Sequence, residues 1–115
     1  MNNMEIPDLS YQVDVDTNVS MGEVVRWFKE EWTDLGITWR NPTARSGSTP
    51  QNWVELGKYH GADPVPYYIL VASRRNNSPR RSDFQHQIAF TRLLIARLEE
   101  KGCKVRFHGY FEEYL

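Results

Sequence analysis

Residues 67–73 read Tyr-Tyr-Ile-Leu-Val-Ala-Ser, and they contain the longest unbroken apolar run of the chain, Tyr67–Ala72. The run has the length of a β-strand and is far shorter than the roughly 18 apolar residues that a membrane-spanning helix requires. Continuous rather than alternating apolar character is typical of a strand in the middle of a sheet. We therefore expect a central strand here, buried on both faces or nearly so.

A helix and a final strand follow this run. Ser82 and Gln85 have the spacing of a capping box, in which side chains satisfy the free N–H groups at a helix start. Gly102 lies where a helix commonly ends, which predicts a helix over 83–101. Residues 104–111 then alternate between apolar and polar side chains, as a half-buried strand does. The expected buried face of the helix over 83–101 consists of Phe84, Ile88, Thr91, Ile95 and Leu98.

Toward the N-terminus the sequence also predicts a strand and a helix, but there the strand comes first. Apolar residues alternate with polar ones over 11–16, which predicts a half-buried strand. Ser20 and Glu23 form a second capping-box pair, and Gly36 provides a stop, so we expect a helix over 21–35. Its apolar face would consist of Val25, Phe28, Trp32 and Leu35.

The segment between the first helix and the central strand is harder to assign. Residues 37–40 are β-prone, 41–51 are rich in Pro, Gly, Ser and Thr, and 53–59 alternate again. We interpret them as a strand, a mobile loop and a returning strand. Together they would form an extra hairpin or arm at 37–60.

The predicted fold class is α+β. Two β-α-β units fit a ferredoxin-like βαββαβ sandwich, in which an antiparallel sheet carries both helices on one face. Residues 1–10 are polar and form a loose lead-in, and 11–115 form a single domain.

Composition argues for an ordinary globular protein. The chain has 40 % hydrophobic and 25 % charged residues and a net charge of −1. Its single cysteine, Cys103, suits a reducing compartment, and the first ten residues lack the pattern of a signal peptide. We therefore expect a cytoplasmic protein that is not inserted in a membrane.

Catalytic and metal-binding motifs are not apparent. His60, His86 and His108 lie outside metal-ligand spacing of one another, so the sequence predicts no metal and no cofactor. Asp14 and Asp16 are interpreted as solvated acids on the outer side of a strand. An alternative hypothesis is a small ferredoxin-like dimeric enzyme that uses His60 with Asp63 as an acid–base pair.

The most distinctive local feature is a group of four arginines just before the second helix. Guanidinium groups and helix N-termini both favour anions, so phosphate, RNA or an acidic protein surface would suit this segment. The simpler interpretation is a solvated loop that keeps the protein soluble. These arginines are Arg74, Arg75, Arg80 and Arg81.

Large aromatic residues in the middle of the chain are candidate interface anchors. Trp53 and Tyr59 are of the residue types that dominate binding energy at protein interfaces, although they could instead pin the loop to the body. Small, near-neutral, aromatic-rich and motif-poor chains are common among bacterial immunity proteins and phage inhibitors. The leading hypothesis is therefore a non-enzymatic protein that sterically occupies another macromolecule, and a nucleic-acid-binding domain using Arg74–Arg81 is the first alternative.

Overall fold

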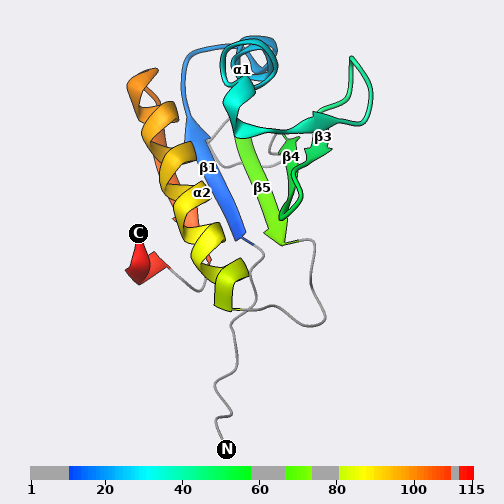
Figure 1. Cartoon of the computed structure of the whole chain (residues 1–115). Helices are drawn as coiled ribbons and strands as arrows, with labels where there is room; N and C mark the ends of the chain where they lie inside the picture. The colour runs from blue at the N-terminus through cyan, green and yellow to red at the C-terminus, as the bar shows by residue number, and fades with distance from the viewer. Residues whose placement is uncertain (1–10, 58–66, 74–80, 110–111) are drawn as a thin grey trace, which may run out of the picture.

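The computed structural model describes residues 11–57, 67–73, 81–109 and 112–115 (Figure 1). In 67–73 and 81–84 the description covers the backbone and, of the side chains, only that of Ile69. The elements are β1 (Tyr11–Asp16), α1 (Met21–Arg26), the π-helix η1 (Trp27–Glu31), the 3₁₀-helix η2 (Thr33–Leu35), β2 (Thr38–Trp39), β3 (Ser46–Ser48), β4 (Asn52–Gly57), β5 (Tyr67–Ser73), α2 (Arg81–Glu100), β6 (Lys104–His108) and the 3₁₀-helix η3 (Glu112–Tyr114).

The strands form one sheet in the order β2-β3-β4-β5-β1-β6, and every neighbouring pair is antiparallel. β5 lies inside the sheet between β4 and β1, as its apolar run predicted. β1 also lies inside, since Val13 pairs with Ile69 on one side and with Phe107 on the other. The α+β class expected from the sequence is confirmed.

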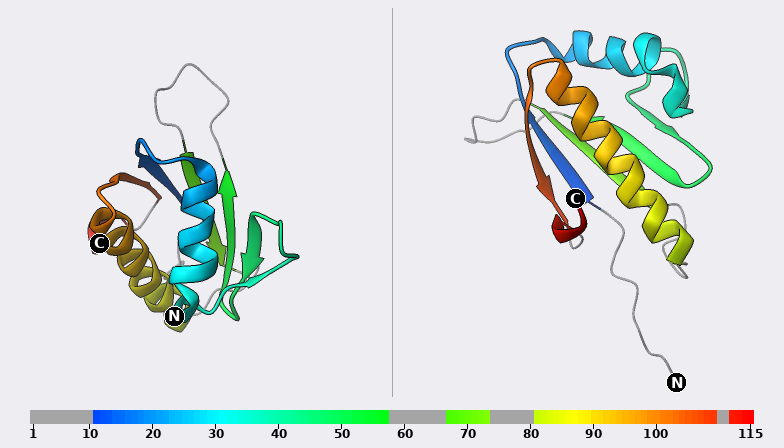
Figure 2. Two further views of the ribbon diagram at one scale, coloured as in Figure 1. Left: turned by 90° about the horizontal axis from the view of Figure 1, so that it is seen from above. Right: turned by 60° about the vertical axis from the view of Figure 1, so that its left-hand side comes forward.

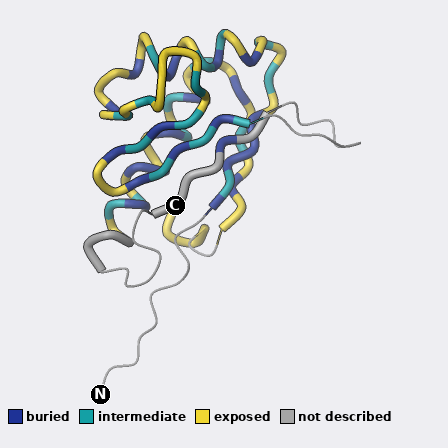
Figure 3. Tube along the Cα trace, turned by 90° about the vertical axis from the view of Figure 1, so that its right-hand side faces the viewer, coloured by how far each residue is buried: buried dark blue, intermediate teal, exposed yellow. Residues whose placement is uncertain are grey.

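One face of this sheet carries the hydrophobic core. Val13, Val15, Val54 and Leu56 are at most 3 % exposed, and they alternate with more polar neighbours along their strands (Figure 3). Side chains from α1, η1 and α2 join the same buried cluster, so both helical segments cover this inner face (Figure 2). The other face, which we call the outer face, is covered by no helix of the described ranges.

The prediction of one continuous helix over 21–35 was wrong. The α-helix ends at Arg26, and a π-helical turn follows, closed by the bond from Trp32 N to Trp27 O at 2.8 Å. A π turn takes one more residue than an α turn, and it lets the adjacent residues Trp27 and Phe28 both reach the core. Phe28 then meets Trp32 edge to face, with 4.8 Å between ring centroids.

The second helix begins at Arg81 and presents a different face from the one expected. Ile88 and Ile95 are only half-buried. Thr91 and Leu98 of the expected face are fully buried, and so is Gln87, which was not expected to be. Gln87 Nε2 donates to the carbonyl of Gln51 at 3.3 Å, and Thr91 Oγ1 donates to the carbonyl of Gln87 at 2.7 Å. Among the helix residues whose side chains the structure describes, the buried ones are Gln87, Phe90, Thr91, Leu94 and Leu98.

Residues 38–57 extend the sheet. The prediction that 41–51 is entirely loop was wrong, because β3 forms within it and pairs with both β2 and β4. The backbone N–H of Leu56 also donates to the carbonyl of Arg45 at 2.8 Å, which ties this segment to β4. Strands at 38–39 and 52–57 match the expected positions of the outgoing and returning strands.

No helix within the described ranges is both long and apolar enough to cross a membrane. Cys103 is a free cysteine that is buried in the core cluster.

Candidate functional site

Of the residues proposed from the sequence as a binding surface, the structure describes only Trp53 in full. Trp53 lies in β4, half-buried, and alternates with the buried residues Asn52 and Val54. It therefore belongs to the outer face. Tyr59, Arg74, Arg75 and Arg80 lie outside the described residues, and so do His60 and Asp63; Arg81 begins α2, but its side chain is not described.

The outer face carries paired charges along β1 and β6. Asp14 lies opposite Arg106, and Asp16 lies opposite Lys104. Unlike charges directly opposite each other on neighbouring strands stabilise an antiparallel pair by about 0.2–1 kcal/mol. These four residues and Val105 line a shallow cavity of about 140 Å³.

Asp14 is the focus of a small polar network. Gln12 Nε2 donates to Asp14 Oδ1 at 2.7 Å, and His108 Nε2 lies 2.7 Å from Asp14 Oδ2. The Asp14 side chain is 7 % exposed and that of His108 is 48 % exposed. A buried carboxylate thus orients an imidazole that faces solvent. The expectation that Asp14 is a solvated acid was wrong, because its neighbours replace water around it.

The sequence did contain a signal for this pair. Alternation places Asp14 and His108 on the polar sides of their strands, and the predicted fold sets the last strand beside the first. Within the described residues no three His, Cys, Asp or Glu side chains gather as metal ligands.

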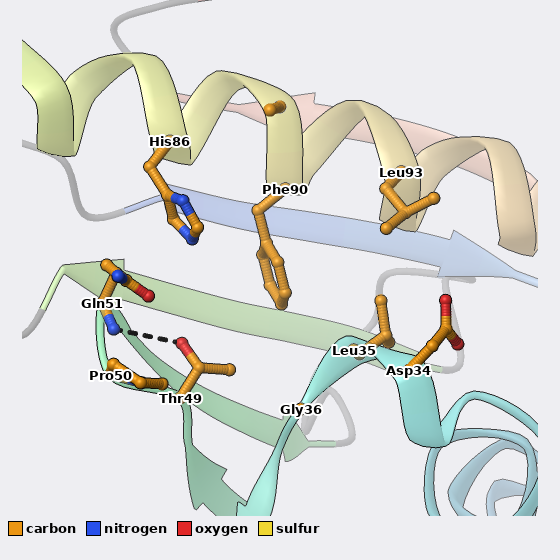
Figure 4. Close-up of a pocket in the computed structure, with 10 residues that line it drawn as sticks. Asp34, Leu35, Gly36, Thr49, Pro50, Gln51, His86, Phe90 and Leu93 are labelled. Atoms are coloured by element: carbon orange, nitrogen blue, oxygen red, sulfur yellow. Dashed lines mark hydrogen bonds between the residues drawn. The ribbon is translucent and has the colours of Figure 1, made fainter.

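A larger cavity lies on the inner side of the sheet, between α2, the turn around Gly36 and the β3–β4 turn (Figure 4). Its volume is about 300 Å³. Figure 4 shows His86, Phe90 and Leu93 projecting from α2 toward the opposite wall. The residues that line it are Asp34, Leu35, Gly36, Thr49, Pro50, Gln51, His86, Ala89, Phe90 and Leu93.

An ion pair lies at one end of this cavity. Arg97 donates to both carboxylate oxygens of Asp34, with Nη1 to Oδ1 at 2.8 Å and Nη2 to Oδ2 at 2.5 Å. The hydrogen bonds from Arg97 lower the pKa of Asp34, and those to Asp34 raise the pKa of Arg97. The one carboxylate in the lining is therefore held ionised and neutralised by its partner.

Buried polar groups lie between this cavity and the sheet. Thr49 Oγ1 accepts from the backbone N–H of Gln51 at 3.2 Å and from that of Asn52 at 2.9 Å, which holds the β3–β4 turn. Tyr11 is buried and hydrogen-bonded to Thr91 of α2. Burial raises the pKa of the Tyr11 hydroxyl, and the hydrogen bond with Thr91 lowers it by a smaller amount. Sequence reasoning missed this site, because its residues come from three separate segments and share no motif.

Comparison with known proteins adds no relative: no family model, no curated protein and no solved structure matches this chain.

Proposed function

We propose that this chain is a non-enzymatic protein-binding module that sterically occupies a macromolecular partner, in the manner of an immunity or inhibitor protein, and that it does so with the outer face of its sheet. The observation that carries the proposal is the position of Trp53. Trp53 is half-buried on a sheet face that no helix of the described residues covers, and tryptophans in such positions are often interface hot spots.

The charges on the outer face favour a protein over a nucleic acid. Asp14, Asp16 and Glu55 lie on the same face as Lys104 and Arg106, so the face carries both signs. Acidic side chains repel a phosphate backbone, whereas a mixed face can match a protein surface of complementary pattern. A nucleic-acid-binding role would depend on the Arg74–Arg81 segment instead.

We also propose a ferredoxin-like core. The order β6-β1-β5-β4 within the antiparallel sheet, with both helical segments on one face, supports that assignment. Strands β2 and β3 would then be an extension at the β4 edge. We propose the cytoplasm as the location, which the free, buried thiol of Cys103 supports.

A matched pair of tryptophans tests the binding surface. Trp39 is also half-buried, but it lies opposite Gly47 and beneath Lys29 of η1, on the inner side. Once a partner is identified by crosslinking in the native host, its affinity for the Trp53→Ala variant should fall at least tenfold, or about 1.4 kcal/mol. Trp39→Ala should bind normally. Equal loss in both variants, or none in Trp53→Ala, would place the binding surface elsewhere.

The arginine-rich segment is the second part of the surface that we propose. Replacing Arg74, Arg75, Arg80 and Arg81 with Glu should leave the melting temperature nearly unchanged if this segment is the solvated loop that its sequence predicts, since surface ion pairs contribute little to folding. Affinity should fall at least about tenfold, in part through a slower association rate. A steep linear fall of log affinity with log salt for the wild type would instead identify nucleic acid as the partner.

A small enzyme remains the second candidate function, and the Asp14–His108 pair is the observation that favours it. A carboxylate that holds one imidazole nitrogen leaves the other available for proton transfer. If turnover of any substrate is found, His108→Gln should abolish it, whereas Trp39→Ala should not.

A further inference from the structure

We propose that the edge of β6 that faces away from β1 binds an extended acidic segment of a partner protein, in which two carboxylates flank one apolar residue. β6 is the last strand in the order of the sheet, and among the described strands it pairs with β1 alone (Figure 2). The proposal rests on the protein-binding function proposed above for its class of partner, but it uses a different part of the sheet from Trp53.

The backbone of residues 104–106 can bind such a segment. In an antiparallel ladder, alternate residues of a strand direct their N–H and C=O groups toward one neighbour, and the residues between them direct these groups to the opposite side. No strand of the described ranges lies on that opposite side of β6, and no backbone hydrogen bond from a described turn or loop reaches residues 104–106. An extended peptide can therefore add a strand here, a mode of recognition called β-augmentation.

Two cations on β6 favour acidic side chains in the added strand. Lys104 and Arg106 are exposed on the outer face, roughly 7 Å apart along the strand. Neither forms an ion pair with a residue that the structure describes, and Asp14, which lies opposite Arg106, contacts Gln12 and His108 instead. Acidic residues two positions apart in an added strand would lie beside both cations, whether that strand runs parallel or antiparallel to β6.

The residue between the two acids should be apolar. Val105 lies between the two cations in sequence but on the inner side of the sheet, where it packs against the core and is only half-buried. Val15, its partner in β1, is completely buried and has a neighbouring strand on each side, whereas Val105 has one on a single side. An apolar side chain in an added strand would cover the exposed part of Val105.

The chain itself contains a strand with this pattern. The part of β1 that pairs with residues 104–106 reads Asp-Val-Asp over residues 14–16. A second strand of the same pattern on the other side of β6 would place each cation between two acidic neighbours. A second copy of β6 fits poorly, because antiparallel pairing centred on Val105 or on Arg106 sets one cation opposite another, which is destabilising.

The test is a titration of the full chain with the capped peptide Thr-Thr-Asp-Val-Asp-Thr-Thr, followed by amide NMR. We expect the signals of residues 104–106 to shift, and amide exchange to slow at alternate residues among them, because only those face the added strand. The peptide Thr-Thr-Asn-Val-Asn-Thr-Thr has the same shape without the charges. At low salt it should bind at least about threefold more weakly, since two pairs of unlike charges are lost.

Arg40 provides a matched control. It is an exposed arginine next to β2, the strand at the other margin of the sheet, and it forms no ion pair within the described ranges. Arg40→Gln should keep the preference for the Asp peptide, whereas Lys104→Gln combined with Arg106→Gln should abolish it. Trp53→Ala should bind the peptide as the wild type does, so failure of the β6 edge can be distinguished from failure of the Trp53 surface.

Four results would each overturn the proposal. The first is that the Asp peptide shifts no signal of residues 104–106 at concentrations up to about 10 mM. The second is that the two peptides bind alike, or that the double variant still prefers the Asp peptide. The third is that these signals shift with the concentration of the chain alone, which would assign the edge to a second copy. The fourth is tighter binding there of a single-stranded oligonucleotide of equal charge, which would assign the edge to a nucleic acid.

Discussion

The imidazole of His108 in β6 is held by the carboxylate of Asp14 in β1, with 2.7 Å between Nε2 and Oδ2, although the two residues are 94 positions apart in sequence. A double-mutant cycle with Asp14→Asn and His108→Gln should measure this link. We expect a coupling energy of about 0.5–3 kcal/mol in urea unfolding, the range for side chains in direct contact. Additive effects of the two substitutions would show that the pair contributes nothing to the fold.

The helix faces allow a second stability test. Leu94→Ala and Phe28→Ala should each lower the free energy of unfolding by about 2–5 kcal/mol, because both side chains are completely buried. Ile88→Ala and Ile95→Ala should cost clearly less, because these residues are half-buried. Urea denaturation of the four variants measures the difference. A larger loss at Ile88 than at Leu94 would mean that Ile88, and not Leu94, faces the core.

Acid should weaken the contact between Asp34 and Arg97. Hydrogen bonds from Arg97 lower the pKa of Asp34 in the folded chain, so its ionised form stabilises the fold above its ordinary pKa near 3.8 and that stabilisation disappears as the pH falls further. The stability difference between wild type and Asp34→Asn should therefore be constant from pH 7 to about pH 5 and shrink below about pH 4. Glu99→Gln, at an exposed position of α2, serves as the control.

The pairing of β3 with β2 can be tested through Gly47. A Cβ atom at this position would lie 2.6 Å from the carbonyl oxygen of Thr38 and 2.8 Å from Cγ2 of Ile37. Gly47→Ala should thus destabilise the protein by about 1–3 kcal/mol, the usual cost of overpacking. At Gly22 in α1 the nearest atom would be Ser20 Oγ at 3.9 Å, so Gly22→Ala should be neutral or slightly stabilising in the same thermal melt.

Local signals in the sequence predicted most of the strands and the start of α1. The start of α2 was predicted less well, because the helix begins at Arg81 and Ser82, which was expected to cap it, lies inside the helix. Ser20 does cap α1, accepting from the N–H of Glu23, and Gly36 does adopt the left-handed conformation, with φ of 72°. The π turn at Trp27 could not be predicted in the same way, because its lower local stability is offset by burying two adjacent aromatics in a core formed by distant strands. The burial of Gln87 likewise depends on the carbonyl of Gln51, which is remote in sequence.

The position of β1 also bears on how the protein is made. Val13 is translated well before the residues that pair with it, Ile69 and Phe107. Until then the backbone N–H and C=O groups on both sides of β1 have no neighbouring strand with which to form hydrogen bonds. Its apolar side chains likewise have no sheet to pack in. The sheet around β1 can therefore be completed only after β6 has been synthesised.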